Sequence, residues 1–198
     1  MSQYGDPEGT FASLRTAAAP ADVDAYRATP QFAVSLSKLV VMSLCTLGFY
    51  EVYWAYKQWE TYRRREQDDL SPFWRALFAS IFAFSLLPRI QRVTATYGVH
   101  ATWSGFALAL GYFLINICWR LPGPLWLASL FRFLPLLVVQ RSINALNAAV
   151  TPEAPRNDKY SGLNVAMIVI GGLVLLLAIL GTLLPEAGSD PAVHSVAA

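Results

Sequence analysis

Charged residues are scarce in this chain of 198 residues: Asp, Glu, Lys and Arg together make up 14% of it, compared with about 25% in typical soluble proteins. Hydrophobic residues make up 55%, and long stretches lack the polar face that the helices of a soluble domain need. The net charge of +2 and the lack of a continuous basic face exclude a nucleic-acid-binding protein. The composition therefore predicts an all-α fold, a polytopic bundle of transmembrane helices.

Sequence motifs for metal binding and catalysis are missing as well. Cys45 and Cys118 are isolated, with no CxxC pair and no histidine at ligand spacing, so we expect neither a disulfide framework nor a zinc site. The chain contains no GxSxG, HExxH or Walker sequence. We therefore predict no metal, no cofactor and no catalytic residue, and we favour a protein that is not an enzyme.

The apolar residues fall into five segments that polar stretches separate. The last segment is the clearest, because the run from 163 to 184 carries no charge and is long enough to cross a bilayer core of about 30 Å. Tyr and Trp residues gather near the segment ends, as they do at membrane interfaces. We therefore predict a transmembrane domain over residues 32–185, with spans at about 32–56, 73–92, 103–119, 124–141 and 161–184.

The two ends of the chain have a different composition. Residues 1–31 mix Gly, Pro, Ala, Asp and Thr without helical periodicity, and they lack the basic and apolar regions of a signal peptide. This pattern predicts a disordered N-terminal tail, with a short helix near residues 21–27. Residues 186–198 are predicted to form a disordered C-terminal tail.

The orientation of the spans depends on where the basic residues lie. With five spans, the N-terminal tail shares one side with the loops after the second and fourth spans, and that side has more Lys and Arg than the other. Because basic residues accumulate on the cytoplasmic side, we predict a cytoplasmic N-terminus. One alternative stays open: Thr46, Leu47 and Gly48 can break the first segment into a re-entrant hairpin, which would reverse everything that follows.

Residues 44–59, LCTLGFYEVYWAYKQW, contain a spaced pattern formed by Thr46, Gly48, Tyr50, Tyr53, Trp54 and Lys57. This run resembles a pattern in uncharacterised bacterial membrane proteins that carry a domain of unknown function, where Thr-x-Gly-x-Tyr-x-x-Tyr-Trp precedes a basic residue. The run SPFWRALF, residues 71–78, is similar to a segment that follows the pattern in such proteins. The resemblance implies a bacterial inner-membrane location and supplies no activity, substrate or catalytic residue.

Glu51, Arg75, Arg132 and Asn116 form the candidate polar cluster inside the predicted spans. Ionisable side chains in a span usually face the bundle interior and pair with each other. At a rise of about 1.5 Å per residue, Glu51 and Arg132 come to comparable depth, with Arg75 nearer the interface and Asn116 within hydrogen-bonding reach. We therefore predict a buried ion pair between Glu51 and Arg132. The cluster either fixes helix register or forms a polar pocket for an ion, a proton or a small solute.

The residues after the first segment also suggest what the protein contacts. Arg63, Arg64 and Arg65 are predicted to form a basic patch that faces lipid headgroups, so the bilayer is the expected partner. Small residues such as Gly171 and Gly172 favour close helix packing, within the chain, with another membrane protein or with a second copy.

Three functions stay open on this basis. A non-enzymatic accessory or assembly factor that acts through helix–helix contacts agrees with the small size and the missing catalytic motifs. A small transporter or channel subunit agrees with a polar site around Glu51 and Arg132. An intramembrane enzyme that modifies lipid, with Glu51 as general acid or base, lacks a second catalytic group at suitable spacing.

Overall fold

Helices dominate the computed structural model, which describes residues 20–66, 69–99 and 102–184. The predicted all-α fold is confirmed for these ranges, where the nearest approach to a sheet is an isolated bridge between Val34 and Asn157. The elements are α2 (Pro20–Ala28), α3 (Leu36–Cys45), α4 (Phe49–Glu66), α5 (Pro72–Leu77), α6 (Ala79–Thr96), α7 (Gly105–Ile117), the 3₁₀ segments η1 (Cys118–Arg120) and η2 (Gly123–Arg132), α8 (Phe133–Val150) and α9 (Gly162–Leu183).

Two helices are long and apolar enough to cross a membrane, judged by length and composition. They are the continuous run Gly123–Val150, formed by η2 and α8, and the helix Gly162–Leu183. Two shorter apolar helices, Leu36–Cys45 and Gly105–Arg120, also correspond to predicted segments. The predicted fourth span is extended, because α8 continues beyond residue 141 to Val150.

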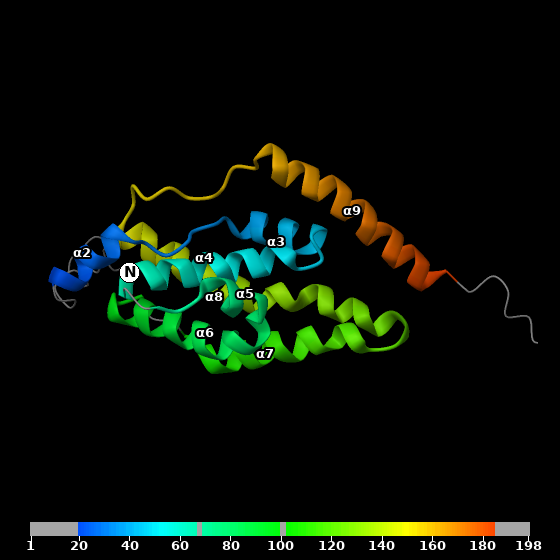
Figure 1. The fold of residues 1–198 in the computed structure, drawn as a ribbon, viewed down its shortest axis with the longest axis horizontal. Coiled ribbons are helices and arrows are strands. Elements are labelled where there is room, and N and C mark those ends of the chain that lie inside the picture. The colour runs from blue at the N-terminus through cyan, green and yellow to red at the C-terminus, as the bar shows by residue number, and fades with distance from the viewer. Residues whose placement is uncertain (1–19, 67–68, 100–101, 185–198) are drawn as a thin grey trace, which may run out of the picture.

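The predicted first span is not one helix. α3 ends at Cys45, α4 begins at Phe49, and the chain reverses between them (Figure 1). Leu47 and Gly48 both have positive φ, 50° and 87°, a conformation that glycine adopts readily. The Thr46 hydroxyl then accepts a hydrogen bond from the backbone N–H of Tyr50 at 2.9 Å. The continuous span over 32–56 is therefore wrong, and the alternative hairpin is what forms.

The predicted second span is also divided. α5 ends at Leu77, and α6 begins after Phe78, whose backbone is not helical. α5 packs along α4, and α6 then returns to the end of the molecule where α4 finishes, as the ion pair between Arg89 and Glu66 at 2.9 Å shows. α5 and α6 therefore form a second helical hairpin rather than a single span.

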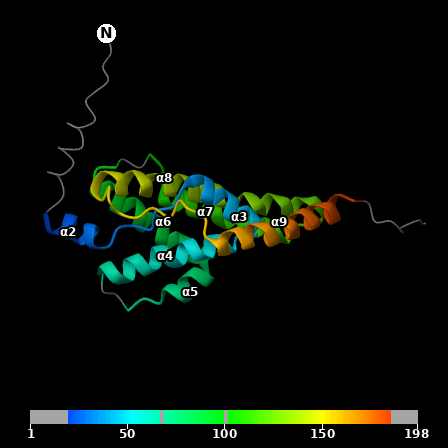
Figure 2. The ribbon, with the colours of Figure 1, turned by 90° about the horizontal axis from the view of Figure 1, so that it is seen from above.

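Several elements end together beside α2, and we call this part of the molecule the α2 end. The C-terminal part of α4 reaches it, because Arg65 donates to the Thr29 carbonyl. The rings of Tyr26 and Tyr97 place the end of α6 there, with centroids 4.9 Å apart, and the Tyr26 hydroxyl donates to Asn147 of α8. At the opposite end lie the turn between α3 and α4, η1, and the C-terminus of α9 (Figures 1 and 2).

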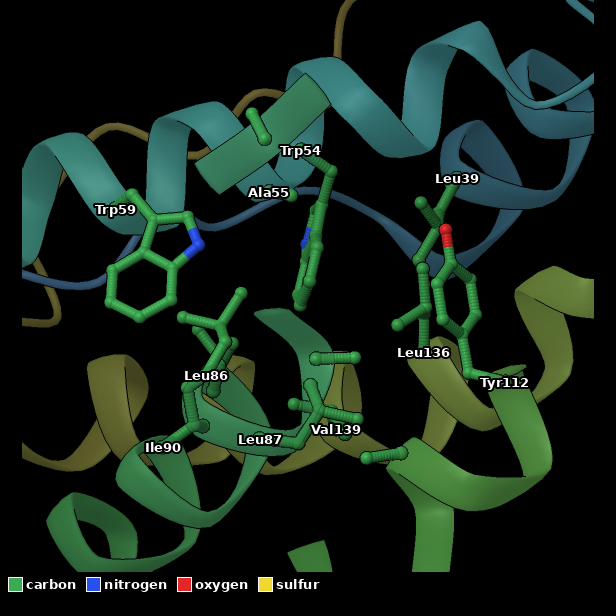
Figure 3. Packing of buried hydrophobic residues seen from close by; sticks show 14 of the residues in the cluster. Leu39, Trp54, Ala55, Trp59, Leu86, Leu87, Ile90, Tyr112, Leu136 and Val139 are labelled. Atoms are coloured by element: carbon green, nitrogen blue, oxygen red, sulfur yellow. The ribbon is translucent and has the colours of Figure 1, made fainter. Parts of the chain in front are cut away.

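The core lies between α4, α6 and α8. Trp54 and Trp59 of α4 are almost completely buried, at 1% and 0% exposure, and they face leucines of α6 and α8 (Figure 3). α7 closes against α6 at Gly105, where a Cβ atom would lie only 2.6 Å from the Pro88 backbone. Glycine is therefore required at this crossing.

The predicted N-terminal tail is partly ordered. Residues 1–19 and 185–198 lie outside the described residues, but the expected short helix forms as α2, and residues 29–35 pass in extended form over α4 and α8. Extended backbone without a sheet needs other hydrogen-bond partners. Side chains of α8 supply them: Asn147 donates to the Gln31 carbonyl at 2.7 Å and Asn144 to the Val34 carbonyl at 2.9 Å.

Candidate functional site

The predicted ion pair between Glu51 and Arg132 forms, with Nε of Arg132 3.0 Å from Oε2 of Glu51. The turn before α4 places Glu51 in its first helical turn, and Arg132 is the last residue of η2. The Glu51 side chain is 1% exposed and the Arg132 side chain 19%. Taking both charges out of water is costly, so the pair depends on further hydrogen bonds for its stability.

All three guanidinium nitrogens of Arg132 find a partner. Nη1 donates to Oδ1 of Asn116 at 3.0 Å, and Nη2 donates to the carbonyl of Leu47 in the turn between α3 and α4. The Tyr112 hydroxyl of α7 lies against the Glu51 carboxylate. We call Glu51, Arg132, Asn116 and the Leu47 carbonyl the clasp, because together they tie the tip of the first hairpin to α7 and η2.

The close fit of the clasp explains the glycine in the turn. A Cβ atom at Gly48 would lie 1.3 Å from Nη2 of Arg132, so no larger residue is compatible with this arrangement. The positive φ of Gly48 favours glycine independently. The turn and the ion pair therefore depend on each other.

A cavity of about 350 Å³ borders the clasp, at the end of the molecule opposite α2. Its walls combine the two charged groups with hydroxyls and indole rings. The lining residues are Ser43, Leu47, Gly48, Glu51, Trp119, Trp126, Ser129, Leu130 and Arg132. This volume is in the range of small-molecule sites, about 300–1,000 Å³. We call it the clasp cavity.

Arg75 does not join the clasp, contrary to the predicted cluster. Its guanidinium lies over the ring of Trp59, 4.6 Å from the centroid, and 5.4 Å from that of Phe82. The prediction assumed that α5 enters a continuous span. Instead α5 packs beside α4, which brings Arg75 to a tryptophan two helical turns beyond Glu51. A cation over an indole face gains electrostatic stabilisation without a carboxylate.

Arg63, Arg64 and Arg65 separate rather than form one patch, because successive helical residues point about 100° apart. Arg65 turns inward, over the ring of Tyr26 at 4.6 Å. Arg64 pairs with Glu60 at 2.6 Å, and Glu60 also pairs with Lys57 at 2.8 Å. The hydrogen bond from Lys57, together with the charge of Arg64, holds the pKa of Glu60 below its ordinary value. Arg63 is exposed, and it alone of the triplet makes no ion pair or ring contact with the described residues.

A row of amide side chains on α8 is a part of the structure that was not predicted from the sequence. Gln140, Asn144 and Asn147 bind the extended segment before α3, and Gln140 also accepts a hydrogen bond from the Trp54 indole at 2.6 Å. Their spacing of four and three residues puts them on one helix face. The sequence does contain a signal for this row, because three amide residues lie on one face of a mainly apolar helix.

The described residues contain no group of three or more His, Cys, Asp or Glu that could hold a metal ion. Comparison with known proteins adds no relative: no family model matches the chain, and no curated protein or solved structure is significantly similar to it. The resemblance of residues 44–59 to a bacterial membrane family therefore stays a prediction.

Proposed function

We propose that the chain is an integral membrane protein that acts as a non-enzymatic accessory or assembly component through helix–helix contacts. The observation that carries this proposal is α9, in which no residue is buried although the helix has no charge. Leu163, Val169 and Ile170 are 71%, 65% and 66% exposed. Such a surface on a helix of this length suits a bilayer core and would favour aggregation in water.

Apolar surface on other elements supports the same location. Phe73 and Ile81 on the second hairpin are 58% and 61% exposed, and Phe106 and Leu114 on α7 are 62% and 54% exposed. These side chains continue the apolar surface beyond α9, as expected for a bundle whose outer face contacts lipid.

The distribution of charge supports a cytoplasmic α2 end. Basic residues gather there, whereas the opposite end carries Arg120 and the ion-paired Arg132 among the described residues. This asymmetry is much stronger than the one expected from five continuous spans, and basic residues favour the cytoplasmic side. The basic residues of the α2 end and the helix parts leading to it are Arg27, Lys38, Lys57, Arg63, Arg64, Arg65, Arg75, Arg89, Arg92, Arg141, Arg156 and Lys159.

This arrangement leads to a specific topology. The α3–α4 and α5–α6 hairpins enter and leave on the cytoplasmic side, while α7, η2 with α8, and α9 each cross the bilayer. The resemblance of residues 44–59 adds the bacterial inner membrane as the location. The clasp has a structural task in this scheme, because Arg132 uses all three nitrogens inside the protein.

Washing isolated membranes tests the proposed membrane location. The full chain should stay with the membrane after washing with alkaline carbonate and should dissolve only in detergent. A photoreactive residue in place of Val169, which faces outward on α9, should crosslink to a discrete membrane protein or to a second copy. Recovery of the chain in the carbonate wash would contradict the proposal.

A small transporter or channel subunit is the second candidate, and the clasp cavity is the observation that favours it. Glu51 and Arg132 line this cavity, and ionisable residues at membrane depth often mark solute or proton paths. Purified chain in liposomes should show no proton or ion flux above that of empty vesicles. Flux that disappears in Glu51→Gln would replace the first proposal with this one.

A further inference from the structure

A second cavity of about 350 Å³ lies between the first turns of α9 and the α3–α4 hairpin. The loop before α9 closes it toward the α2 end, through Asn157 and Lys159. It shares no lining residue with the clasp cavity. We call it the α9 cavity.

The α9 cavity has an apolar part and a polar part. Met42, Phe49, Leu163 and Met167 supply the apolar walls. Phe49 and Leu163 are 74% and 71% exposed, so this part opens sideways, toward the surface that we assign to lipid. Its shape and chemistry therefore suit a hydrocarbon chain that enters from the bilayer.

The polar part carries positive charge. Lys159 is exposed at its rim, and buried Lys38 lies behind the rim, where its Nζ donates to Oδ1 of Asn157 at 2.8 Å and to the Lys159 carbonyl at 2.7 Å. The nearby carboxylate of Asp158 is paired with Arg156 at 3.2 Å. The N-terminus of α9 adds a partial positive charge. An anionic group is therefore favoured at this position.

Tyr50 gives an independent indication of a ligand. The residue lines the α9 cavity and is 5% exposed, yet its hydroxyl has no hydrogen-bond partner among the described residues. A buried hydroxyl is normally paired, and leaving it unpaired is costly. An oxygen atom of a bound molecule would satisfy it.

We propose that the α9 cavity binds one anionic phospholipid from the cytoplasmic leaflet. One acyl chain lies between Phe49, Leu163 and Met167, and the phosphodiester lies near Lys159. The Tyr50 hydroxyl donates to an ester or phosphate oxygen of the lipid. This inference rests on the proposed membrane location, and it adds a defined lipid site to a surface that otherwise contacts bulk lipid.

Native mass spectrometry of the purified full chain in detergent tests the site. Phosphatidylglycerol is added as the anionic lipid, phosphatidylcholine as a lipid without net charge, and glycerol phosphate as a free headgroup. One phosphatidylglycerol should bind, phosphatidylcholine should bind about tenfold more weakly, and glycerol phosphate should not compete at equal concentration. If glycerol phosphate displaced phosphatidylglycerol at equal concentration, the cavity would be a phosphate site that does not recognise the rest of the lipid. This result would overturn the proposal.

Two variants and one control locate the binding. Met167→Trp fills the apolar part of the α9 cavity and should weaken phosphatidylglycerol binding about tenfold. Leu173→Trp, at an outward position of α9 that is 57% exposed, should bind phosphatidylglycerol as the wild type does. Lys159→Gln should remove the preference for phosphatidylglycerol. If Met167→Trp and Leu173→Trp bound phosphatidylglycerol equally well, the lipid would be bound unspecifically around the protein, and the proposal would be overturned.

Tyr50→Phe keeps the test informative if the larger substitution perturbs folding. Without a bound lipid, removal of an unpaired hydroxyl should leave the thermal midpoint unchanged or raised. With lipid bound, the variant should lose about fivefold in affinity, as expected for one hydrogen bond. A variant that binds as tightly as wild type would contradict the proposal. Recovery of the chain in the carbonate wash would instead contradict the proposed membrane location, so the two outcomes are distinguishable.

Discussion

Arg132 binds three separate parts of the chain, so variants of the clasp test whether Glu51 and Arg132 stabilise each other. If Glu51 and Arg132 depend on each other, Glu51→Gln and Arg132→Gln should each strand one charge at a cost of about 3–5 kcal/mol, or somewhat less in a membrane, where water defects relieve the charge. The double variant should recover much of the loss. Thermal unfolding in detergent measures all three against wild type.

The exposed pair of Arg156 and Asp158, with side chains 52% and 44% exposed, provides a control. Arg156→Gln should lower stability by no more than about 1 kcal/mol, because exposed pairs contribute little. Purely additive losses for the two clasp variants would show that Glu51 and Arg132 do not act as a pair.

Glu60 gives a prediction for pH. Its folded pKa lies below the ordinary value of 4.5, first because of the hydrogen bond from Lys57. A lowered pKa stabilises the fold above the ordinary value, and this contribution is lost as the pH falls through the folded pKa. Glu60→Gln should therefore be less stable than wild type at pH 7, and the difference should shrink below pH 4.5 in denaturation curves. A difference independent of pH would contradict this account.

At the scale of elements, Gly171 sets how closely α9 approaches α3. A Cβ atom at Gly171 would lie 1.8 Å from the Cys45 carbonyl oxygen of α3, whereas Gly181 on the same helix has nothing within 4 Å. Gly171→Ala should push α9 away from α3 and destabilise the protein by about 1–3 kcal/mol. Gly181→Ala should be neutral or slightly stabilising, because alanine favours helix. Equal thermal midpoints for both variants would mean that α9 does not pack on α3.

The elements also show what could be predicted from the sequence. α7 and α9 lie close to their expected ranges, because an uninterrupted apolar run determines a helix and its length. The direction of the chain could not be obtained in this way, since hydrophobicity is the same for a helix that crosses and one that turns back. Thr46 and Gly48 signalled the first reversal, but the break at Phe78 has no Gly or Pro to mark it.

The same distinction holds for the candidate site: the pairing of charges could be predicted, but contacts that depend on the path of the chain could not. The pairing of Glu51 with Arg132 was predictable, because two costly charges at similar depth stabilise each other. The position of Arg75 depended on the path of α5, so the prediction was wrong where the assumed path was wrong. The Leu47 carbonyl could not be anticipated, because it becomes available to Arg132 only through the turn.

At the scale of the whole molecule, the two hairpins decide the topology. Five continuous spans would put the chain around residue 69 on the side opposite the N-terminus. With hairpins, the same residues lie on the side of the α2 end, because Glu66 contacts Arg89 and Arg65 contacts Thr29. The central proposal is therefore that both hairpins enter and leave on the cytoplasmic side.

Cysteine labelling in intact cells tests this claim most directly. In a background where Cys45 and Cys118 are replaced by alanine, single cysteines are placed at Asp69 and Leu121, which are both exposed. A reagent that cannot cross the membrane should label Leu121→Cys in intact cells and should label Asp69→Cys only after the cells are opened. Labelling of Asp69→Cys in intact cells, with Leu121→Cys protected or equally labelled, would contradict the account.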